Sequence, residues 1–427
     1  MDRREFIGGA ASGIMLLKAR TAFGYEANSA VRIGLLGCGS RGTTVATSFA
    51  KNTPARIVAL ADLFPDQLAA AKAHFDALNG SLGVPGIEAS LMFRGARAFE
   101  ELAASQAIDA VQISTPPWFH VEHLEAAVAA GKHAYCEKPL GVDVEQTKRA
   151  LAAGKRAEGR VSLDVGFQVR SAPPIAEVVR RIHAGDLGKL VCIEAHYNAP
   201  NAVSHSGAGW SADEFRLRNW LWDRVLSGDI LVEQNIHVID LCNWIIGSHP
   251  ATAWATGGRN AVTAHGETRG DTWDNYQVIY AYEVAGQGDV RVSFASTQWG
   301  NNGFFDVTER IFGDQGIAEA PYSGPVRIIG EHAWSWSEGG AGAAQGAFAP
   351  NGAFTDNLEF ADRDKDRAFI ESIVSGKFHN QAEDGVNSAL SAMLGRMAGQ
   401  RGRAVTWEEQ LKHGEKLELK MDLSQFG

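Results

Sequence analysis

Cysteine is scarce in this sequence, and the few cysteines lie far apart. The chain has 4 cysteines in 427 residues, and no two of them stand in a CxxC pair. Scatter of this kind is unlike the spacing of a disulfide framework or of a cysteine-based zinc site. We therefore expect neither feature at the cysteines, which are Cys38, Cys136, Cys192 and Cys242.

The sequence also lacks a long apolar run and an excess of positive charge. The apolar run that ends at Leu17 is shorter than the ~20 residues that a membrane-spanning helix needs, so we expect no stable membrane span. The formal net charge is −10 at pH 7 and no basic stripe is present, which argues against nucleic acid as a partner. The composition, 45% hydrophobic and 21% charged, is that of a globular protein, and the length suggests two domains.

The first 24 residues are typical of a twin-arginine export signal. Arg3 and Arg4 precede a mildly apolar run, Lys18 and Arg20 follow it, and small residues flank Phe23. Paired arginines, an apolar run and a basic end in this order predict a signal peptide at residues 1–24 and a partner in the export machinery. We expect a periplasmic or extracytoplasmic protein; the alternative is a short, unstructured basic N-terminus.

A glycine-rich turn follows the first strand-like run, Val31–Leu36. Gly37, Gly39 and Gly42 form a GxGxxG pattern, and Asp62 stands twenty residues further on, after a second apolar run. This combination is the dinucleotide-binding fingerprint, in which the pyrophosphate lies at a helix N-terminus. We assign Ser40 and Arg41 of the same turn to the cofactor site as well.

Two residues bear on the choice between NAD and NADP. A carboxylate at Asp62 would accept hydrogen bonds from the ribose hydroxyls of NAD and would repel the 2′-phosphate of NADP. Arg41 complicates this, because an arginine in the glycine loop could reach a 2′-phosphate. We expect NAD, with NADP as the alternative.

Strand and helix signals alternate over residues 31–155, which predicts a Rossmann domain with a parallel sheet and helices on both faces. Residues 156–427 show longer runs of alternating polarity, so we expect an α+β domain with a large, mostly antiparallel open sheet for substrate binding and oligomerisation. Gly, Ala and Pro dominate residues 339–352, which predict a surface loop. Two helices, at 362–375 and 385–398, are expected to pack back on the rest.

Two further segments carry chemistry in the first domain. Thr115 and Pro116 end a strand-like run and precede a helix with His120 and His123, and ligands bind at the carboxyl ends of parallel strands. The HxxH spacing has no third ligand nearby, so we expect no metal. Glu137-Lys138-Pro139 follows the next strand-like run.

Glu137-Lys138-Pro139, the GxGxxG turn and the Thr-Pro turn together resemble the Gfo/Idh/MocA family of nicotinamide-dependent oxidoreductases. The resemblance runs from about Val31 to Lys412 and includes the segments 166–170 and 394–407. It implies that Lys138 lies near the nicotinamide and the reacting carbon. It also assigns Thr115, Pro116, His120, Glu137 and Gln168 to cofactor binding, and Arg170 and Asp240 to the substrate.

The resemblance also implies a second catalytic group in the stretch 227–240; the alternative is an ordinary surface pair of Glu233 and His237, four residues apart on a helix. On one continuous helix Glu233, His237 and Asp240 would share a face. The carboxylate of Glu233 would then orient the His237 imidazole and raise its pKa, and the imidazole would take the hydroxyl proton as hydride leaves. The family usually has Asp where this chain has Glu233, so the role of His237 is the firmer of the two.

Arg218 and Trp220 lie just upstream of this stretch. Arginine can bind hydroxyls or a carboxylate, and tryptophan can stack on a sugar face, so both are candidate substrate residues. The alternative for the tryptophan is a place in the core or in a subunit interface.

These features predict an exported oxidoreductase that acts on a hydroxyl of a sugar, glycoside or polyol with a tightly bound, recycled nicotinamide, as in the glucose–fructose oxidoreductase branch. The periplasm offers little free NAD, so only a resident cofactor would serve there. One alternative is a redox-neutral, NAD-dependent glycoside hydrolase, and another is a non-catalytic NAD-binding sensor. The large second sheet favours a homodimer or homotetramer.

Overall fold

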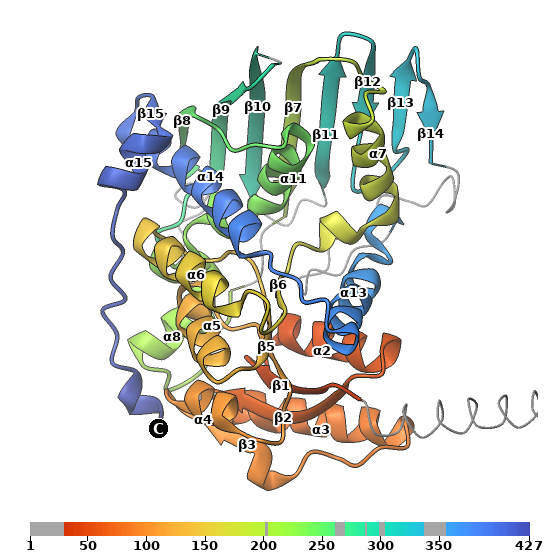
Figure 1. The fold of residues 1–427 in the computed structure, drawn as a ribbon. Helices are drawn as coiled ribbons and strands as arrows, with labels where there is room; N and C mark the ends of the chain where they lie inside the picture. Colours follow the sequence, from red (N-terminus) through yellow and green to blue (C-terminus); the bar gives the residue numbers. More distant parts are fainter. Residues whose placement is uncertain (1–29, 201–203, 261–269, 287, 299–303, 337–355) are drawn as a thin grey trace, which may run out of the picture.

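The computed structural model describes residues 30–200, 204–260, 270–286, 288–298, 304–336 and 356–427. The expected signal peptide (1–24) and the expected Gly-rich loop (339–352) lie outside these residues. Two sheets, each with its own helices, make up the described part of the chain (Figure 1).

The first sheet is parallel throughout and has the strand order 3-2-1-4-5-6, which is that of a dinucleotide-binding Rossmann fold. Its strands, in spatial order, are β3 (Met92–Arg94), β2 (Arg56–Asp62), β1 (Arg32–Leu36), β4 (Ala110–Ile113), β5 (His133–Cys136) and β6 (Leu163–Val165). Its helices are α2 (Ser40–Asn52), α3 (Pro65–Ser81), α4 (Ala98–Ala104), α5 (His120–Ala129) and α6 (Val144–Ala157). The sheet includes β6 and therefore extends past residue 155, where the sequence placed the end of the first domain.

The second sheet has nine strands, and only β7 and β10 pair in parallel. In spatial order they are β14 (Trp334–Ser335), β13 (Arg327–Gly330), β12 (Gly316–Glu319), β11 (Asp306–Gly313), β7 (Leu190–Ala199), β10 (Gly288–Gln298), β9 (Asn275–Val284), β8 (Thr252–Gly258) and β15 (Val405–Thr406). The predicted mostly antiparallel sheet is confirmed.

Helices cover one face of the second sheet (Figure 1). They include α7 (Pro173–His183), α11 (Ile236–Ile246) and α14 (Ala382–Arg401). The remaining helices of the described residues are α8 (Ala212–Arg218), α9 (Arg224–Ser227), α10 (Ile230–Glu233), α13 (Ala361–Ser375) and α15 (Trp407–His413). Short 3-10 turns are η1 (Ala89–Leu91), η2 (Pro117–Phe119), η3 (Gln168–Ser171), η4 (Trp220–Trp222), η5 (Asp356–Leu358) and η6 (Leu423–Phe426).

Alternation of side chains along the strands explains this one-sided cover. On β9, Val278 and Tyr280 are buried beneath the helices, whereas Ile279 between them is 41% exposed. No helix of the described residues is long and apolar enough to cross a membrane.

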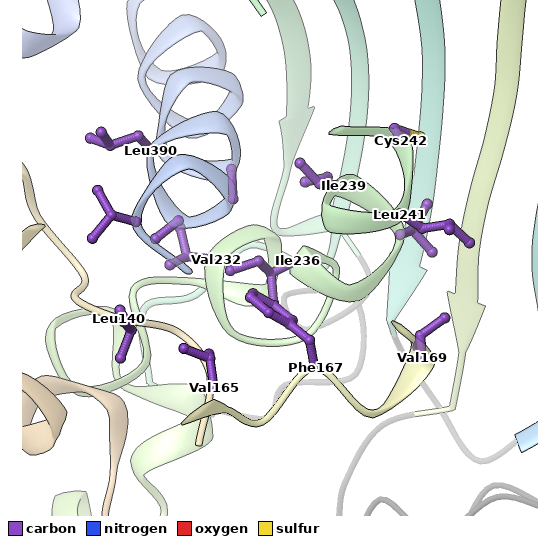
Figure 2. Close-up of a cluster of buried hydrophobic side chains, with 14 of the residues drawn as sticks. Leu140, Val165, Phe167, Val169, Val232, Ile236, Ile239, Leu241, Cys242 and Leu390 are labelled. Carbon is purple, nitrogen blue, oxygen red and sulfur yellow. The ribbon is translucent and has the colours of Figure 1, made fainter. Parts of the chain in front are cut away.

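The two units share one apolar core where the chain passes from β6 to α7. Figure 2 shows Phe167 beside Ile236 and Val232, with Leu140 and Val165 of the first unit close by. Because this core is continuous, the carboxyl ends of β4 and β5 are fixed against α10 and α11, and the candidate site lies at that junction.

Candidate functional site

The glycine turn has the geometry that the fingerprint requires. Gly37 has φ +92, and a Cβ there would lie 2.6 Å from the backbone of Ser114. A Cβ on Gly42 would lie 2.0 Å from the carbonyl oxygen of Gly37, so α2 can approach β1 only through glycine. A Cβ on Gly39 would meet nothing within 4 Å. Gly39 is the N-cap residue of α2, and no side chain caps this end of the helix. The open space beside it therefore fits a pyrophosphate.

Asp62 lies at the carboxyl end of β2 and faces this turn. Its Oδ2 accepts a hydrogen bond from the backbone N–H of Cys38 at 2.6 Å, and its Oδ1 accepts one from that of Phe64 at 2.9 Å. Burial raises the pKa of this carboxyl, and the two backbone donors oppose the rise. The residue stands where a ribose-binding acid is needed in this fold.

Arg41 turns away from Asp62 and into a buried ion cluster. Its Nε donates to Glu137 Oε1 at 2.9 Å, its Nη1 to Asp362 Oδ2 at 2.8 Å, and its Nη2 to Gln168 Oε1 at 2.7 Å. These three acceptors engage all three nitrogens of the guanidinium. Its contacts link the turn to β5, η3 and α13.

His120 connects the loops that follow β4 and β5. Its Nε2 lies 2.7 Å from the carbonyl oxygen of Thr115, and its Nδ1 lies 2.9 Å from that of Pro139. Burial lowers its pKa, and a neutral imidazole donates through one nitrogen only. His123, whose pKa burial lowers to about 3, contacts Thr115 Oγ1 through its Nδ1 at 3.0 Å. Both histidines therefore hold the Thr115–Pro116 turn in place.

Lys138 and Glu233 form a buried ion pair between the two units. The ammonium donates to Glu233 Oε1 at 2.7 Å and to the backbone carbonyl oxygen of Glu233 at 2.6 Å. The two side chains are 10% and 7% exposed. An ammonium has three N–H bonds, so one remains that can donate to a substrate oxygen.

His237 lies next to this pair and edge-on to the ring of Phe167, whose centroid is 6.4 Å from that of the imidazole. Burial and the charge of Lys138 hold its pKa well below the ordinary 6.5, and Arg41 and Lys365 act in the same direction. The imidazole is neutral at pH 7 and is able to accept a proton. Its Nδ1 has no hydrogen-bond partner among the described residues.

The expected Glu233–His237 pair is therefore wrong in two respects. Glu233 binds Lys138 instead of orienting the imidazole, and the pKa of His237 is lowered rather than raised. The continuous helix is also wrong, because α10 ends at Glu233 and α11 begins at Ile236. Lys138 binds the carbonyl oxygen that His237 N–H would need in an unbroken helix.

The expected substrate residues fall into two groups. Arg170 and Asp240 pair with each other through two hydrogen bonds of 2.8 Å, and Arg170 lies 5.8 Å from the Phe167 ring, beside His237. Arg218 instead binds Asp66 beside the carboxyl end of β2, and Trp220 packs in an apolar cluster with Phe119. The contacts of Arg218 and Trp220 place them with the cofactor domain.

Sequence reasoning missed three charged residues of α13, namely Asp362, Lys365 and Asp366. Asp362 accepts from Arg41 and from Lys365 Nζ, and Asp366 is fully buried 3.9 Å from the same ammonium. A signal for them existed, since these three residues share a helix face with Phe369 and Ile370. Charged residues on an apolar face indicate a buried ion cluster.

Asp229 is a second missed residue. It is fully buried with φ 79, a region that favours glycine, and it accepts hydrogen bonds from Trp273 N and the Tyr276 hydroxyl at 3.0 Å each. Burial raises its pKa to about 6. These bonds anchor the start of α10 to the second sheet.

Among the described residues, no group of three or more His, Cys, Asp or Glu side chains could hold a metal ion.

Comparison with known proteins places this geometry in context. The family model for the NAD-binding Rossmann fold of the GFO/IDH/MocA oxidoreductases matches residues 31–165, and the GFO/IDH/MocA C-terminal domain matches residues 175–319. Inositol 2-dehydrogenase of Rhizobium meliloti (strain 1021) is 29% identical over 298 residues, which are 70% of this chain and 78% of that protein.

Solved structures share the whole fold. Levoglucosan dehydrogenase in complex with NADH superposes with a TM-score of 0.67 at 19% identity, over 88% of this chain and 98% of that one. Scyllo-inositol dehydrogenase from Lactobacillus casei, with NAD(H) and scyllo-inositol bound, gives a TM-score of 0.63 at 20% identity, over 89% and 99% of the two chains.

Proposed function

Because the chain belongs to the GFO/IDH/MocA oxidoreductase family, with its NAD-binding Rossmann domain, we propose that it oxidises a hydroxyl of a sugar, glycoside or polyol. The observation that carries the proposal is the Lys138 ammonium, fixed by Glu233 beside the neutral, buried His237 at the carboxyl end of β5. The inositol and levoglucosan dehydrogenases among its relatives support a polyol or an anhydrosugar as substrate.

The residues divide the work as follows. The nicotinamide, when bound, supplies the hydride acceptor. The third N–H of Lys138 donates to the substrate oxygen and stabilises negative charge as it develops there. His237 accepts the hydroxyl proton: burial and the charge of Lys138 keep the ring neutral beforehand, although the same shift makes it a weaker base than a free imidazole. Arg170 and Asp240 fix each other's side chains by hydrogen bonds, and the Arg170 guanidinium lies beside the ring of Phe167.

We also propose that the cofactor is NAD and that it stays bound between turnovers. Asp62 supports NAD, since a carboxylate at that position favours ribose hydroxyls over a 2′-phosphate. The guanidinium of Arg41 is held by Glu137, Gln168 and Asp362, which also supports NAD, because these contacts weaken the case for a bond from Arg41 to a 2′-phosphate. The paired arginines near the start of the sequence support export by the twin-arginine route and a periplasmic location.

The test is a panel of scyllo-inositol, levoglucosan, glucose and an aryl glycoside, given to the purified protein with and without added NAD. We expect at least one polyol or sugar to reduce the cofactor, seen as NADH absorbance. His237→Gln should lower turnover by ~10² or more, the usual scale for loss of a general base. His332→Gln, at an exposed position, is the matched control.

Two results would contradict the dehydrogenase. Release of the aglycone from the glycoside without net formation of NADH would identify the protein as a redox-neutral glycoside hydrolase. Absence of any spectral change with every sugar, in a protein that binds NADH, would assign the sensor.

A further inference from the structure

Two segments from beyond the first sheet in the sequence lie on the turn between β2 and α3, residues 62–66. One is α8, and the other is the tail, residues 419–427. Figure 1 shows the chain descending from α15 alongside the first unit to end near α4 and α8. We call α8 and the tail together the clasp.

Arg218 is the centre of the clasp. Its Nη1 and Nη2 bind the two oxygens of Asp66 at 2.9 and 2.8 Å, and its Nε donates to Glu214 Oε1 at 2.8 Å. The guanidinium carbon also lies 3.9 Å from the ring centroid of Phe64, and the side chain is only 13% exposed. A bidentate ion pair combined with a cation–π contact fixes α8 against the turn.

The tail holds the same turn from another side. The ring of Phe426 packs edge-on against Phe64 with centroids 5.5 Å apart, and the carbonyl oxygen of Gly427 accepts from Ala96 N at 3.0 Å. Gln425 Nε2 donates to Asp213 Oδ2 at 3.0 Å, so the tail and α8 also bind each other.

The clasp lies at the edge of the first sheet where a dinucleotide binds. The turn begins at Asp62, the acid that faces the glycine turn, and the adenosine half of a dinucleotide binds at this end of a 3-2-1-4-5-6 sheet. Trp118 and Phe119, which follow β4, belong to the same apolar cluster as Phe64 and Phe426. The clasp therefore connects the carboxyl ends of β2 and β4, between which the adenosine would lie.

We propose that the clasp retains the adenosine half of the cofactor, and that Arg218 and Phe426 are the residues that keep it closed. This inference rests on the resident cofactor of the proposed function and identifies the part of the chain that makes it resident. A dinucleotide can then leave only after the Arg218–Asp66 pair and the Phe64–Phe426 contact have separated.

The experiment measures the dissociation rate of bound NADH. The full-length protein is loaded with NADH and mixed with excess NAD, and the loss of NADH fluorescence gives the rate. We expect Arg218→Met and Phe426→Ala each to release NADH about tenfold faster than the wild type, the scale of a partly buried ion pair or aromatic contact. Arg291→Met, which breaks the exposed Arg291–Asp289 pair on the second sheet, should leave the rate unchanged.

A variant with exchanged charges distinguishes loss of cofactor retention from a general loss of protein stability. The double variant Asp66→Arg, Arg218→Asp restores the pair in reverse and should slow release relative to either single change. Rates equal to that of the wild type in both Arg218→Met and Phe426→Ala would overturn the inference, as would NADH exchange in the wild type too fast to follow. Neither result depends on a substrate, so the sugar panel can fail while the clasp is confirmed.

Discussion

His237 determines how the activity should depend on pH. A base works in its neutral form, and burial together with the charge of Lys138 holds the pKa of this imidazole well below 6.5. Activity is lost only when the pH falls through that lowered pKa. We therefore expect kcat to stay level from pH 8 to below 6.5, measured with saturating substrate in buffers of constant ionic strength. A fall in kcat centred at or above pH 6.5 would contradict the assignment.

Glu233 fixes Lys138 with its carboxylate as well as with its backbone carbonyl. Glu233→Gln removes the counter-charge of a buried ammonium, so we expect kcat to fall by about 10- to 100-fold, the cost of disturbing a charged hydrogen bond in a catalytic site. Steady-state kinetics with the best substrate of the panel measures this. The control is Glu283→Gln, an exposed glutamate on β9, and equal kcat values in the two variants would remove Glu233 from the mechanism.

At the scale of elements, local signals predicted most of the strands. The strand-like run Val31–Leu36 contains β1, which spans Arg32–Leu36, and the glycine turn lies where the fingerprint places it. Glu233, His237 and Asp240 are predicted to lie on one continuous helix because their spacing keeps the helical period. The helix is interrupted because Lys138, 95 residues earlier, binds the carbonyl oxygen of Glu233. A hydrogen bond over that distance leaves no trace in local periodicity.

Helix α13 brings Asp366 into the buried ion cluster, and this should change stability with pH. Burial raises the pKa of Asp366 to about 7, against 3.8 when unfolded, so the unfolded chain ionises first as the pH rises. The contribution of Asp366 to the free energy of unfolding should then fall between about pH 4 and pH 7 and stay level above. Asp362 does not add to this window, since Arg41 and Lys365 overcome the effect of burial and lower its pKa.

Asp366→Asn removes this titration. We expect the variant to gain on the wild type by about 2–4 kcal/mol in free energy of unfolding between pH 4 and pH 8, the equivalent of a shift of up to about three pKa units. Denaturant titrations at the two pH values measure the change. Asp289→Asn, at an exposed carboxylate, is the control. A difference between Asp366→Asn and the wild type that does not change with pH would show that Asp366 titrates normally.

At the scale of the whole molecule, the sequence predicted two units but not how they are joined. The continuous core of Figure 2, the ion cluster that Arg41 forms with Asp362, and the contacts of the tail all connect residues far apart in the chain. Arg218 shows the consequence. Its type and place in the sequence suggested a substrate residue, whereas its partner Asp66 is 152 residues away and belongs to the cofactor domain.

We expect subunits to meet on the face of the second sheet that no helix of the described residues covers. Large apolar side chains are exposed on its strands, among them Val191 at 54%, Trp254 at 45% and Ile279 at 41%. Burying such a face stabilises a homodimer or homotetramer. We expect light scattering to give a mass of two or four chains, and Ile279→Asp to shift it toward one. A wild-type protein that is monomeric at micromolar concentration would contradict this.

The last prediction joins the proposed export signal to the proposed resident cofactor. Twin-arginine signals direct proteins that fold in the cytoplasm, and a cofactor that the clasp retains would be loaded there, because the periplasm offers little free NAD. We expect the protein in the periplasmic fraction with nicotinamide bound, detected by mass spectrometry. Arg3→Lys together with Arg4→Lys should leave the same loaded protein in the cytoplasm. Export of that variant would exclude the twin-arginine route, whereas exported wild-type protein without nicotinamide would exclude the resident cofactor and leave the route intact.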